Sequence, residues 1–133
     1  MNSKYLYHEG GFTLLELMIV MSIIGILSIV AIPKFSTAIT LANTSKIQAD
    51  LQTLDTAIAL YQAQNGHVPS NANADLSEYI VDIAKLKPPQ GDCFLKDGST
   101  VKITAESYTL SSDGQHALCD KYTLNELGRA EKK

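Results

Sequence analysis

One uninterrupted apolar run, residues 12–32, constrains this 133-residue chain more than any other feature. The run contains a single charged residue, Glu16. As a helix it would be about 32 Å long, close to the roughly 30 Å hydrocarbon thickness of a bilayer. The rest of the chain is too small to surround such a helix on every side. The sequence therefore predicts a membrane-spanning helix, followed from Pro33 onward by a water-soluble part.

A cleaved secretory signal peptide fits this segment poorly. A signal peptide has an apolar core of about 7–15 residues, followed by a cleavage site of small residues. Here the run is longer and is followed by Pro33 and Lys34, whereas the small residues Gly10 and Gly11 precede it. Lysines stand on both sides of the run, so the positive-inside rule does not fix its orientation.

Glu16 is the charge that requires an explanation. A carboxylate inside a membrane helix is costly, and residues of this kind usually serve a function. The run offers no Lys, Arg or His as a partner. Cleavage between Gly11 and Phe12 would create an α-amine at Phe12, and this amine, on the same or a neighbouring copy, would be a suitable cation. The alternative is that Glu16 lies close enough to the membrane surface to stay hydrated.

The residues GFTLLEL at positions 11–17, directly ahead of a membrane-length apolar stretch, resemble the type III signal of type IV pilins and pseudopilins. The resemblance implies a leader peptide of residues 1–11 and cleavage after Gly11 by a prepilin peptidase. It further implies N-methylation of Phe12 and an assembly role for Phe12 and Glu16. Gly25 and Pro33 match positions where helices of this family loosen or kink.

By the same resemblance, the chain is expected to be the structural subunit of a type IV pilus-like filament. The precursor would wait in the cytoplasmic membrane with its head outside the cytoplasm. An assembly ATPase and a membrane platform would then move it into a helical homo-oligomer, in an extracellular or periplasmic filament. Two alternatives stay open: a pseudopilin of a type II secretion or competence (DNA-uptake) system, and a singly anchored membrane protein with a ligand-binding head.

The segment after Pro33 has the pattern of an amphipathic helix. Its apolar residues recur at steps of four, three, four and three, at Ile47, Leu51, Leu54, Ile58 and Tyr61. The polar residues between them, Lys46, Gln48, Asp50, Gln52, Asp55 and Gln62, are expected to form a solvated face. We predict one long helix over residues 12–64, ended by Asn65 and Gly66. Its membrane part is residues 12–33, and residues 34–65 continue it.

Residues 66–133 are predicted to form a small globular head. We expect a loop over residues 67–74 and a short helix over 75–86. Four short strands should follow at 93–96, 100–105, 107–111 and 117–120, with hairpin turns at Asp97-Gly98 and Asp113-Gly114. The tail from residue 124 is expected to be loose or a short helical end. The predicted fold class is α+β, a long helix packed on a small antiparallel β-meander.

Cys93 and Cys119 are the only cysteines of the chain. A head of this size is in the range where a hydrophobic core needs additional support. In an oxidising compartment a Cys93–Cys119 disulfide would close a loop of about 26 residues, worth about 3.5 kcal/mol in the chain-entropy model. Two free thiols are the alternative. The spacing supports neither a redox CxxC motif nor a structural zinc site.

The sequence contains no recognisable catalytic motif. It has no Gly-x-Ser-x-Gly elbow, no P-loop and no dinucleotide fingerprint. His67 and His116 are isolated, and the acids Asp92, Asp97, Asp113 and Asp120 match no calcium-loop spacing, so turn formation explains them better. The net charge of −3 does not favour nucleic-acid binding. We therefore predict a protein that is not an enzyme, with no metal and no cofactor.

Overall fold

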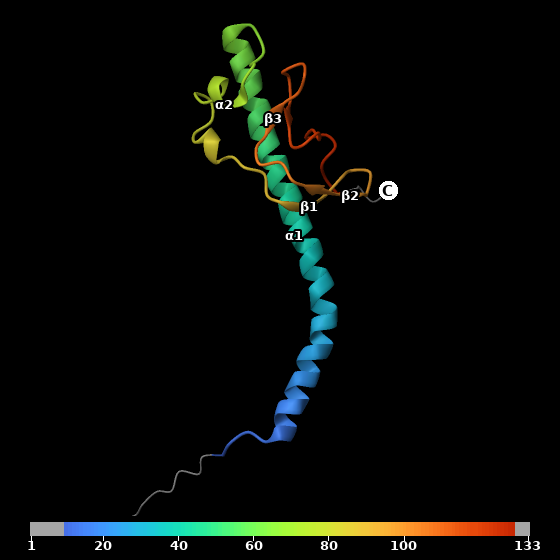
Figure 1. Cartoon of the computed structure of the whole chain (residues 1–133). Helices are drawn as coiled ribbons and strands as arrows, with labels where there is room; N and C mark the ends of the chain where they lie inside the picture. Colours follow the sequence, from blue (N-terminus) through green and yellow to red (C-terminus); the bar gives the residue numbers. More distant parts are fainter. Residues whose placement is uncertain (1–9, 130–133) are drawn as a thin grey trace, which may run out of the picture. The chain divides into compact units, whose positions relative to one another are not determined.

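The computed structural model of the chain describes residues 10–129. It divides into two compact units, one ending at Phe35 and the other beginning at Ser36. One long helix, α1 (Leu14–Asn65), contributes to both units (Figure 1). The second unit adds the short helices α2 (Ala72–Asp75) and η1 (Ile83–Lys85). Its strands are β1 (Gly91–Phe94), β2 (Thr100–Ile103), β3 (Thr109–Leu110) and β4 (Ala117–Leu118). This arrangement confirms the predicted α+β class. Apart from Gly10 and Gly11, the predicted leader lies outside the described residues.

The single long helix is confirmed, with small changes at its ends. It begins at Leu14 and contains Pro33 in its interior. It ends at Asn65 because Gly66 adopts a positive φ of 75° and donates its N–H to the carbonyl of Gln62 at 2.9 Å, a typical helix stop. The predicted loosening at Gly25 and kink at Pro33 stay predictions.

The first half of α1 exposes apolar side chains over its whole length. Leu14, Ile23 and Ile32, for example, are more than half exposed in the single chain. Among the described residues, α1 is the one helix long and apolar enough to cross a membrane. The hydroxyls of Ser22 and Ser28 donate to the carbonyls four residues earlier, so the helix itself satisfies both polar groups.

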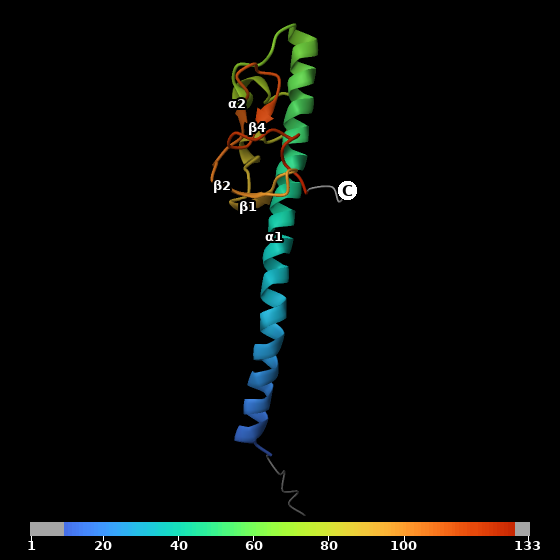
Figure 2. The ribbon, with the colours of Figure 1, turned by 90° about the vertical axis from the view of Figure 1, so that its right-hand side faces the viewer.

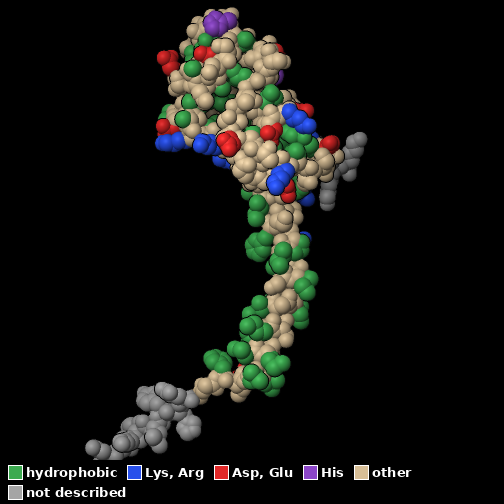
Figure 3. All heavy atoms as spheres, viewed as in Figure 1, with side chains coloured by type: hydrophobic (Ala, Val, Ile, Leu, Met, Phe, Trp, Pro, Cys, Tyr) green, Lys and Arg blue, Asp and Glu red, His purple; other side chains and the backbone are tan. Residues whose placement is uncertain are grey.

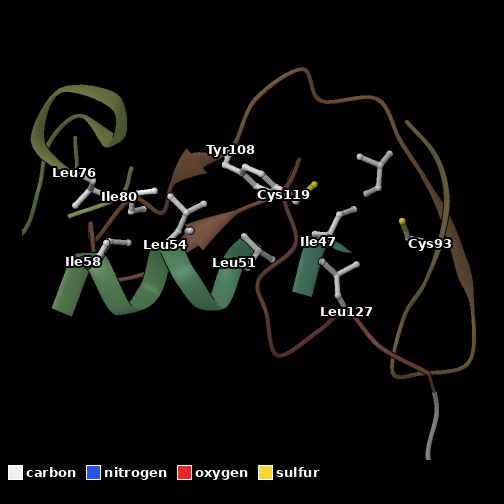
Figure 4. Close-up of a cluster of buried hydrophobic side chains, with 13 residues drawn as sticks. Ile47, Leu51, Leu54, Ile58, Leu76, Ile80, Cys93, Tyr108, Cys119 and Leu127 are labelled. Carbon is white, nitrogen blue, oxygen red and sulfur yellow. The ribbon is translucent and has the colours of Figure 1, made fainter. Parts of the chain in front are cut away.

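The second half of α1 supplies the centre of the head's core. Ile47, Leu51, Leu54 and Ile58 are at most 2% exposed, as the amphipathic spacing predicted (Figure 4). They pack in one cluster with buried residues from every later part of the head, among them Leu76, Ile80, Cys93, Ile103, Tyr108, Cys119 and Leu127. Figure 2 shows these later segments along one side of the helix, with the opposite side uncovered.

The expected meander is divided into two separate two-stranded sheets. β1 pairs with β2 in antiparallel register from Gly91↔Ile103 to Phe94↔Thr100, around the predicted turn at Asp97-Gly98. β3 pairs with β4 around the predicted turn at Asp113-Gly114. Both hairpins are therefore confirmed, although β2, β3 and β4 are shorter than the predicted strands and β1 begins two residues earlier than predicted.

The predicted helix over residues 75–86 is wrong, and part of the predicted loop before it is helical. Asn71 starts α2 earlier because its Oδ1 accepts the N–H groups of Asn73 and Ala74, at 3.0 and 3.1 Å. Asp82 then adopts a left-handed conformation with a φ of 57°, which interrupts any longer helix. Only the single turn of η1 follows it.

The described part of the tail is also not loose. Leu127 is fully buried and forms a β-bridge with Leu95. Its carbonyl accepts a hydrogen bond of 2.9 Å from the Gln48 side chain, and the neighbouring Gly128 N–H donates to the carbonyl of Phe94 at 3.0 Å. The tail is fixed because one buried leucine and several backbone hydrogen bonds attach it to β1 and to α1.

Candidate assembly site at the start of the long helix

The first turn of α1 is closed by a reciprocal pair of side chains, Thr13 and Glu16. Oε2 of Glu16 accepts two hydrogen bonds from Thr13, one from the backbone N–H at 2.9 Å and one from Oγ1 at 3.0 Å. The N–H of Glu16 in turn approaches Oγ1 of Thr13 at 3.2 Å. This is a capping box, in which two side chains satisfy N–H groups that a helix start leaves without partners.

The capping box uses the Thr13 hydroxyl as a helix cap. Because Thr13 precedes the first turn, its hydroxyl has no earlier turn to bond to and caps the helix instead. It also gives Glu16 a local partner that charge counting missed. A negative charge in the first turn interacts favourably with the helix dipole. The signal was present in the sequence as Thr-x-x-Glu ahead of an apolar run.

Phe12 and Glu16 lie beside each other at this end of the chain. They line one surface hollow together with Leu17, Ile19 and Val20. Phe12 is 90% exposed, and Gly11 is also exposed, ahead of the first residue of the helix. The structure thus brings the two predicted assembly residues, Phe12 and Glu16, together. At Gly25, an added Cβ would meet nothing within 4 Å, so the single chain alone does not explain a glycine there.

A second polar site joins α1 to the head. Asp50 is 6% exposed, and its carboxylate binds both the Lys46 amine, at 2.5 and 2.6 Å, and the Tyr108 hydroxyl, at 2.7 Å. Burial, followed by the hydrogen bond to Asp50, raises the pKa of Tyr108 well above its usual range. The hydrogen bond between Asp50 and Tyr108 attaches α1 to the head. The Asp50 carboxylate and the Tyr108 hydroxyl would each be costly to bury without a partner.

The predicted solvated face of α1 is therefore wrong in part. Besides Asp50, Asp55 accepts the Ala117 N–H at 2.7 Å, and its other oxygen lies 3.6 Å from Nδ1 of His116. The Gln48 side chain reaches the tail. These residues stand at the edges of the buried stripe, next to Ile47, Leu51 and Leu54. The periodicity of the sequence predicts which face of the helix such side chains lie on. It does not predict the groups with which they form hydrogen bonds.

Cys93 and Cys119 are free and fully buried members of the same core cluster (Figure 4). Burial is the main cause that raises the pKa of both thiols, for Cys119 to about 12. Both are therefore protonated and poorly reactive in the folded head. The structure contains no disulfide between them, and the predicted bond stays a prediction.

The acids of the hairpin turns accept local hydrogen bonds, as turn formation predicted. Oδ1 of Asp97 accepts from the N–H and the hydroxyl of Ser99, and Oδ1 of Asp113 accepts from Ser111 and Gln115. These bonds lower the pKa of both carboxyls. Within residues 10–129, no group of three or more His, Cys, Asp or Glu side chains is placed to hold a metal ion.

The family model described as the prokaryotic N-terminal methylation motif matches residues 7–32. This match covers Gly11, Phe12, the capping box and the whole apolar run. No solved structure shows a significant match to the chain.

Several curated proteins are similar over more of the chain. The type II secretion system core protein G of Escherichia coli K12 is 32% identical over 116 residues, which cover 84% of this chain and 78% of that protein. Competence protein ComGC of Halalkalibacterium halodurans is 35% identical over 79 residues, 59% of this chain and 78% of the relative. Fimbrial protein Q of Moraxella bovis is 38% identical over 67 residues, 49% and 43% of the two chains.

These three relatives match a chain whose fold is an apolar helix that continues into a small head. All of them are pilin-like structural subunits, and an apolar first helix of this kind anchors the precursor in a membrane. The chain belongs to the type IV pilin-like family and is a pilin-like subunit.

Proposed function

We propose that the chain is the structural subunit of a type IV pilus-like filament, polymerised through the first half of α1. The observation that carries the proposal is the capping box, which sets the Glu16 carboxylate beside Phe12 at the start of an exposed apolar helix. Residues 12–33 would form the membrane and filament-core segment, residues 34–65 its amphipathic continuation, and residues 66–133 the head. The proposal assigns the chain no catalytic residue, metal, cofactor or nucleic-acid site.

Processing would begin with hydrolysis of the peptide bond between Gly11 and Phe12 by a prepilin peptidase. The methylation motif covers both residues, and both are exposed and lie outside the helix. A scissile bond must be able to enter a protease site in extended form, which a helical bond cannot do without unwinding. Methylation of the new Phe12 amine would follow. The cleaved subunit would stay anchored in the cytoplasmic membrane, with its head outside the cytoplasm.

Assembly would move the helix from lipid into a bundle of like helices, driven by an assembly ATPase and a membrane platform. The exposed apolar side chains of α1 would then be covered by neighbouring copies, inside an extracellular or periplasmic filament. Glu16 would pair with the Phe12 amine of a neighbour. A wrong stagger would leave the carboxylate buried without a cation, so the pair would set the register between subunits.

A pseudopilin role in a type II secretion or competence system is the second candidate. It is favoured by similarity over 84% of the chain to a type II secretion system core protein G. Both roles use the same fold and processing, so deletion of the gene decides between them. Loss of surface pili supports the pilus, whereas loss of exoprotein release or of DNA uptake with normal pili supports the pseudopilin.

Three variants of the first turn test the assembly role. Glu16→Gln keeps the capping box, because a glutamine oxygen also accepts from Thr13, but removes the charge. Thr13→Ala removes the two hydrogen bonds of the Thr13 hydroxyl and keeps the charge. Glu16→Ala removes the charge and the two hydrogen bonds of the carboxylate, while the Thr13 hydroxyl can still cap the N–H of residue 16. We expect Glu16→Gln and Glu16→Ala to insert in the membrane and to assemble poorly, and Thr13→Ala to assemble. Normal filament yield from Glu16→Gln would remove the proposed charge pair.

N-terminal sequencing and intact mass of the protein from its native membrane test the processing step. A start at methylated Phe12 supports it. A chain that still begins at Met1, in cells with an active prepilin peptidase, would contradict it and would favour the singly anchored protein considered above.

A further inference from the structure

A groove runs beside β3 in the head, and we call it the β3 groove. Its larger part, of about 550 Å³, lies between residues 68–73 and residues 108–114. A second part, of about 290 Å³, lies next to η1. Ala72, Asn73 and Tyr108 line both parts, so the two adjoin and together follow the chain on either side of β3.

β3 is paired along one edge only. Ser111 donates its N–H to the carbonyl of His116 at 2.9 Å, which makes every second residue of β3, counted from Ser111, a hydrogen-bonded position. The N–H and C=O of Leu110 therefore point away from β4. The same alternation holds opposite Leu110, where the Ala117 N–H donates to Asp55 of α1. Within the described part of the chain, no hydrogen bond uses the two backbone groups of Leu110.

The opposite wall of the β3 groove does not pair with this free edge. Across the residues that the structure describes, no backbone hydrogen bond joins residues 68–73 to residues 106–114. Two N–H groups of that wall, those of Ser70 and Asn71, donate instead to Asp75, at 2.8 and 2.9 Å. An unpaired strand edge beside an open groove is the kind of surface to which an extended peptide adds as a further strand.

The charges around the β3 groove favour a basic residue at one end of such a peptide. Residues 66–84 and 103–120 contain no Lys or Arg. On the face that Figure 3 presents, Lys and Arg side chains lie over the lower half of the head and none lies at its top. Asp113 lines the larger part of the groove. Its Oδ1 accepts from Ser111 and Gln115, whereas its Oδ2 accepts no hydrogen bond from any described residue and can bind a cation of the peptide.

The part of the β3 groove next to η1 is lined by apolar side chains. Leu54, Ile83 and Leu86 belong to the core or pack against it. Lys87 and Glu106 are exposed beside them, and their opposite charges offset each other. A Val, Ile or Leu side chain of the peptide would cover apolar area at this end. Because side chains alternate along a strand, every second residue of the peptide would face the groove.

We propose that the β3 groove binds an extended peptide of a partner protein, which adds as a strand to the free edge of β3. The peptide has a Lys or Arg beside Asp113 and an apolar residue at the end lined by Leu54 and Ile83. Backbone hydrogen bonds to Leu110 supply affinity, and the side chains at the two ends supply selectivity. The inference concerns the head alone and goes beyond the proposed filament function.

Random peptides of about seven residues, an ordinary strand length, are the probe. They are displayed on phage and selected on the full chain in detergent. We expect the enriched peptides to share a basic residue and, toward the other end, a Val, Ile or Leu. A selection that enriches no peptide of this kind would overturn the proposal.

Asn73→Trp fills the β3 groove where its two parts meet. Asn73 is exposed, so the larger side chain should leave the fold of the head intact. Asn125→Trp is the matched control, because Asn125 is also exposed but does not line the groove. Selected peptides should bind Asn73→Trp at least tenfold more weakly than they bind the unaltered chain or Asn125→Trp. Equal binding to all three proteins would place the peptide elsewhere and overturn the proposal.

Asp113→Asn tests the charged end separately. An asparagine Oδ1 can still accept from Ser111 and Gln115, so the variant keeps the turn and removes only the charge. Binding of a selected basic peptide should weaken about two- to fivefold, as expected for an exposed ion pair. The same peptide with alanine in place of its basic residue should bind both proteins equally. Equal weakening of the two peptides would overturn the proposed position of the basic residue.

Amide hydrogen exchange distinguishes strand addition from other ways of binding. The Leu110 amide should exchange at least tenfold more slowly when a selected peptide is bound, because its N–H then has a partner. The Ser111 amide is the internal control, since it already donates to His116 and should change little. Unchanged exchange at Leu110 in the peptide-bound protein would overturn strand addition.

Discussion

The Tyr108 hydroxyl donates a 2.7 Å hydrogen bond to a carboxylate oxygen of Asp50, and both residues are buried where α1 meets the head. The contact joins residues 58 positions apart in the sequence. It carries a formal charge into the core, with Lys46 as the partner that keeps the charge compensated. This hydrogen bond holds the head against the helix. Its removal should lower the stability of the head more than it affects assembly.

We expect Tyr108→Phe to lower the free energy of unfolding by about 1–3 kcal/mol, because it leaves a buried carboxylate oxygen without one of its donors. The measurement is chemical unfolding of the full chain in detergent. Tyr79→Phe is the control, since the Tyr79 hydroxyl also makes a 2.7 Å hydrogen bond, to Gln64, but at an exposed position. An equal decrease in the free energy of unfolding for the two variants would show that burial does not increase the contribution of the Asp50–Tyr108 hydrogen bond to stability.

Gly114 gives a test of backbone geometry. It adopts a φ of 68° in the turn between β3 and β4, and a Cβ there would come within 2.9 Å of Cγ2 of Val68. Gly66 has a similar φ of 75° but open space around it. We expect Gly114→Ala to destabilise the head by more than Gly66→Ala, which should cost about 1 kcal/mol through its backbone alone. The difference between the thermal unfolding midpoints of the two variants measures the effect of the close contact with Val68. Equal midpoints would show that this contact has no effect.

The free energy of unfolding of the head should decrease at alkaline pH. The pKa of Cys119 is raised from 9.0 to about 12 by burial, and that of Tyr108 is raised from 10.0. A raised pKa means that the folded state holds its proton more tightly than the unfolded state. Its stabilising contribution is therefore complete below about pH 9 and is lost progressively as the pH rises toward 12. Unfolding curves of the protein with both thiols free, measured between about pH 8 and about pH 11, should show this loss.

The Tyr108→Phe variant separates the two contributions to that alkaline loss. It removes the tyrosine part and leaves the cysteine part, which begins about one unit lower. A variant curve that follows the unaltered protein over the whole alkaline range would show that Tyr108 does not contribute.

The elements that local sequence patterns determine were predicted well. The apolar run, the stripe from Ile47 to Ile58 and the glycine turns each depend on residues close together in the chain. The wrong predictions concern residues whose surroundings are determined by contacts with distant parts of the chain. Asp50 and Asp55 were predicted to be solvated, but Asp50 accepts a hydrogen bond from Tyr108 and Asp55 accepts one from β4. The tail was predicted to be loose, but Leu127 is buried in the core. In the assembly site, Glu16 was singled out as the one charge of the apolar run, and the resemblance added the assembly role of Phe12 and Glu16. The cap by Thr13 was missed, although the Thr-x-x-Glu spacing was visible in the sequence.

The cysteines provide the last prediction, which concerns when a disulfide could form. Cys93 and Cys119 are both fully buried, and their raised pKa values keep the nucleophilic thiolate scarce in the folded head. An oxidant would therefore have to act before the head closes. We expect protein from the native membrane to carry the bond, and protein expressed in a reducing cytoplasm and folded there to keep both thiols free and slow to react with alkylating reagents.

Alkylation with and without denaturant, followed by intact mass, distinguishes these states. Protein with the bond gains no label even when unfolded, until a reductant is added. Protein with two buried thiols gains both labels on unfolding and neither in the native state. The oxidised form should be more stable by about 3.5 kcal/mol in the chain-entropy model, provided that the core accommodates the bond without strain. Two labels on denatured protein taken directly from the native membrane would contradict the predicted disulfide.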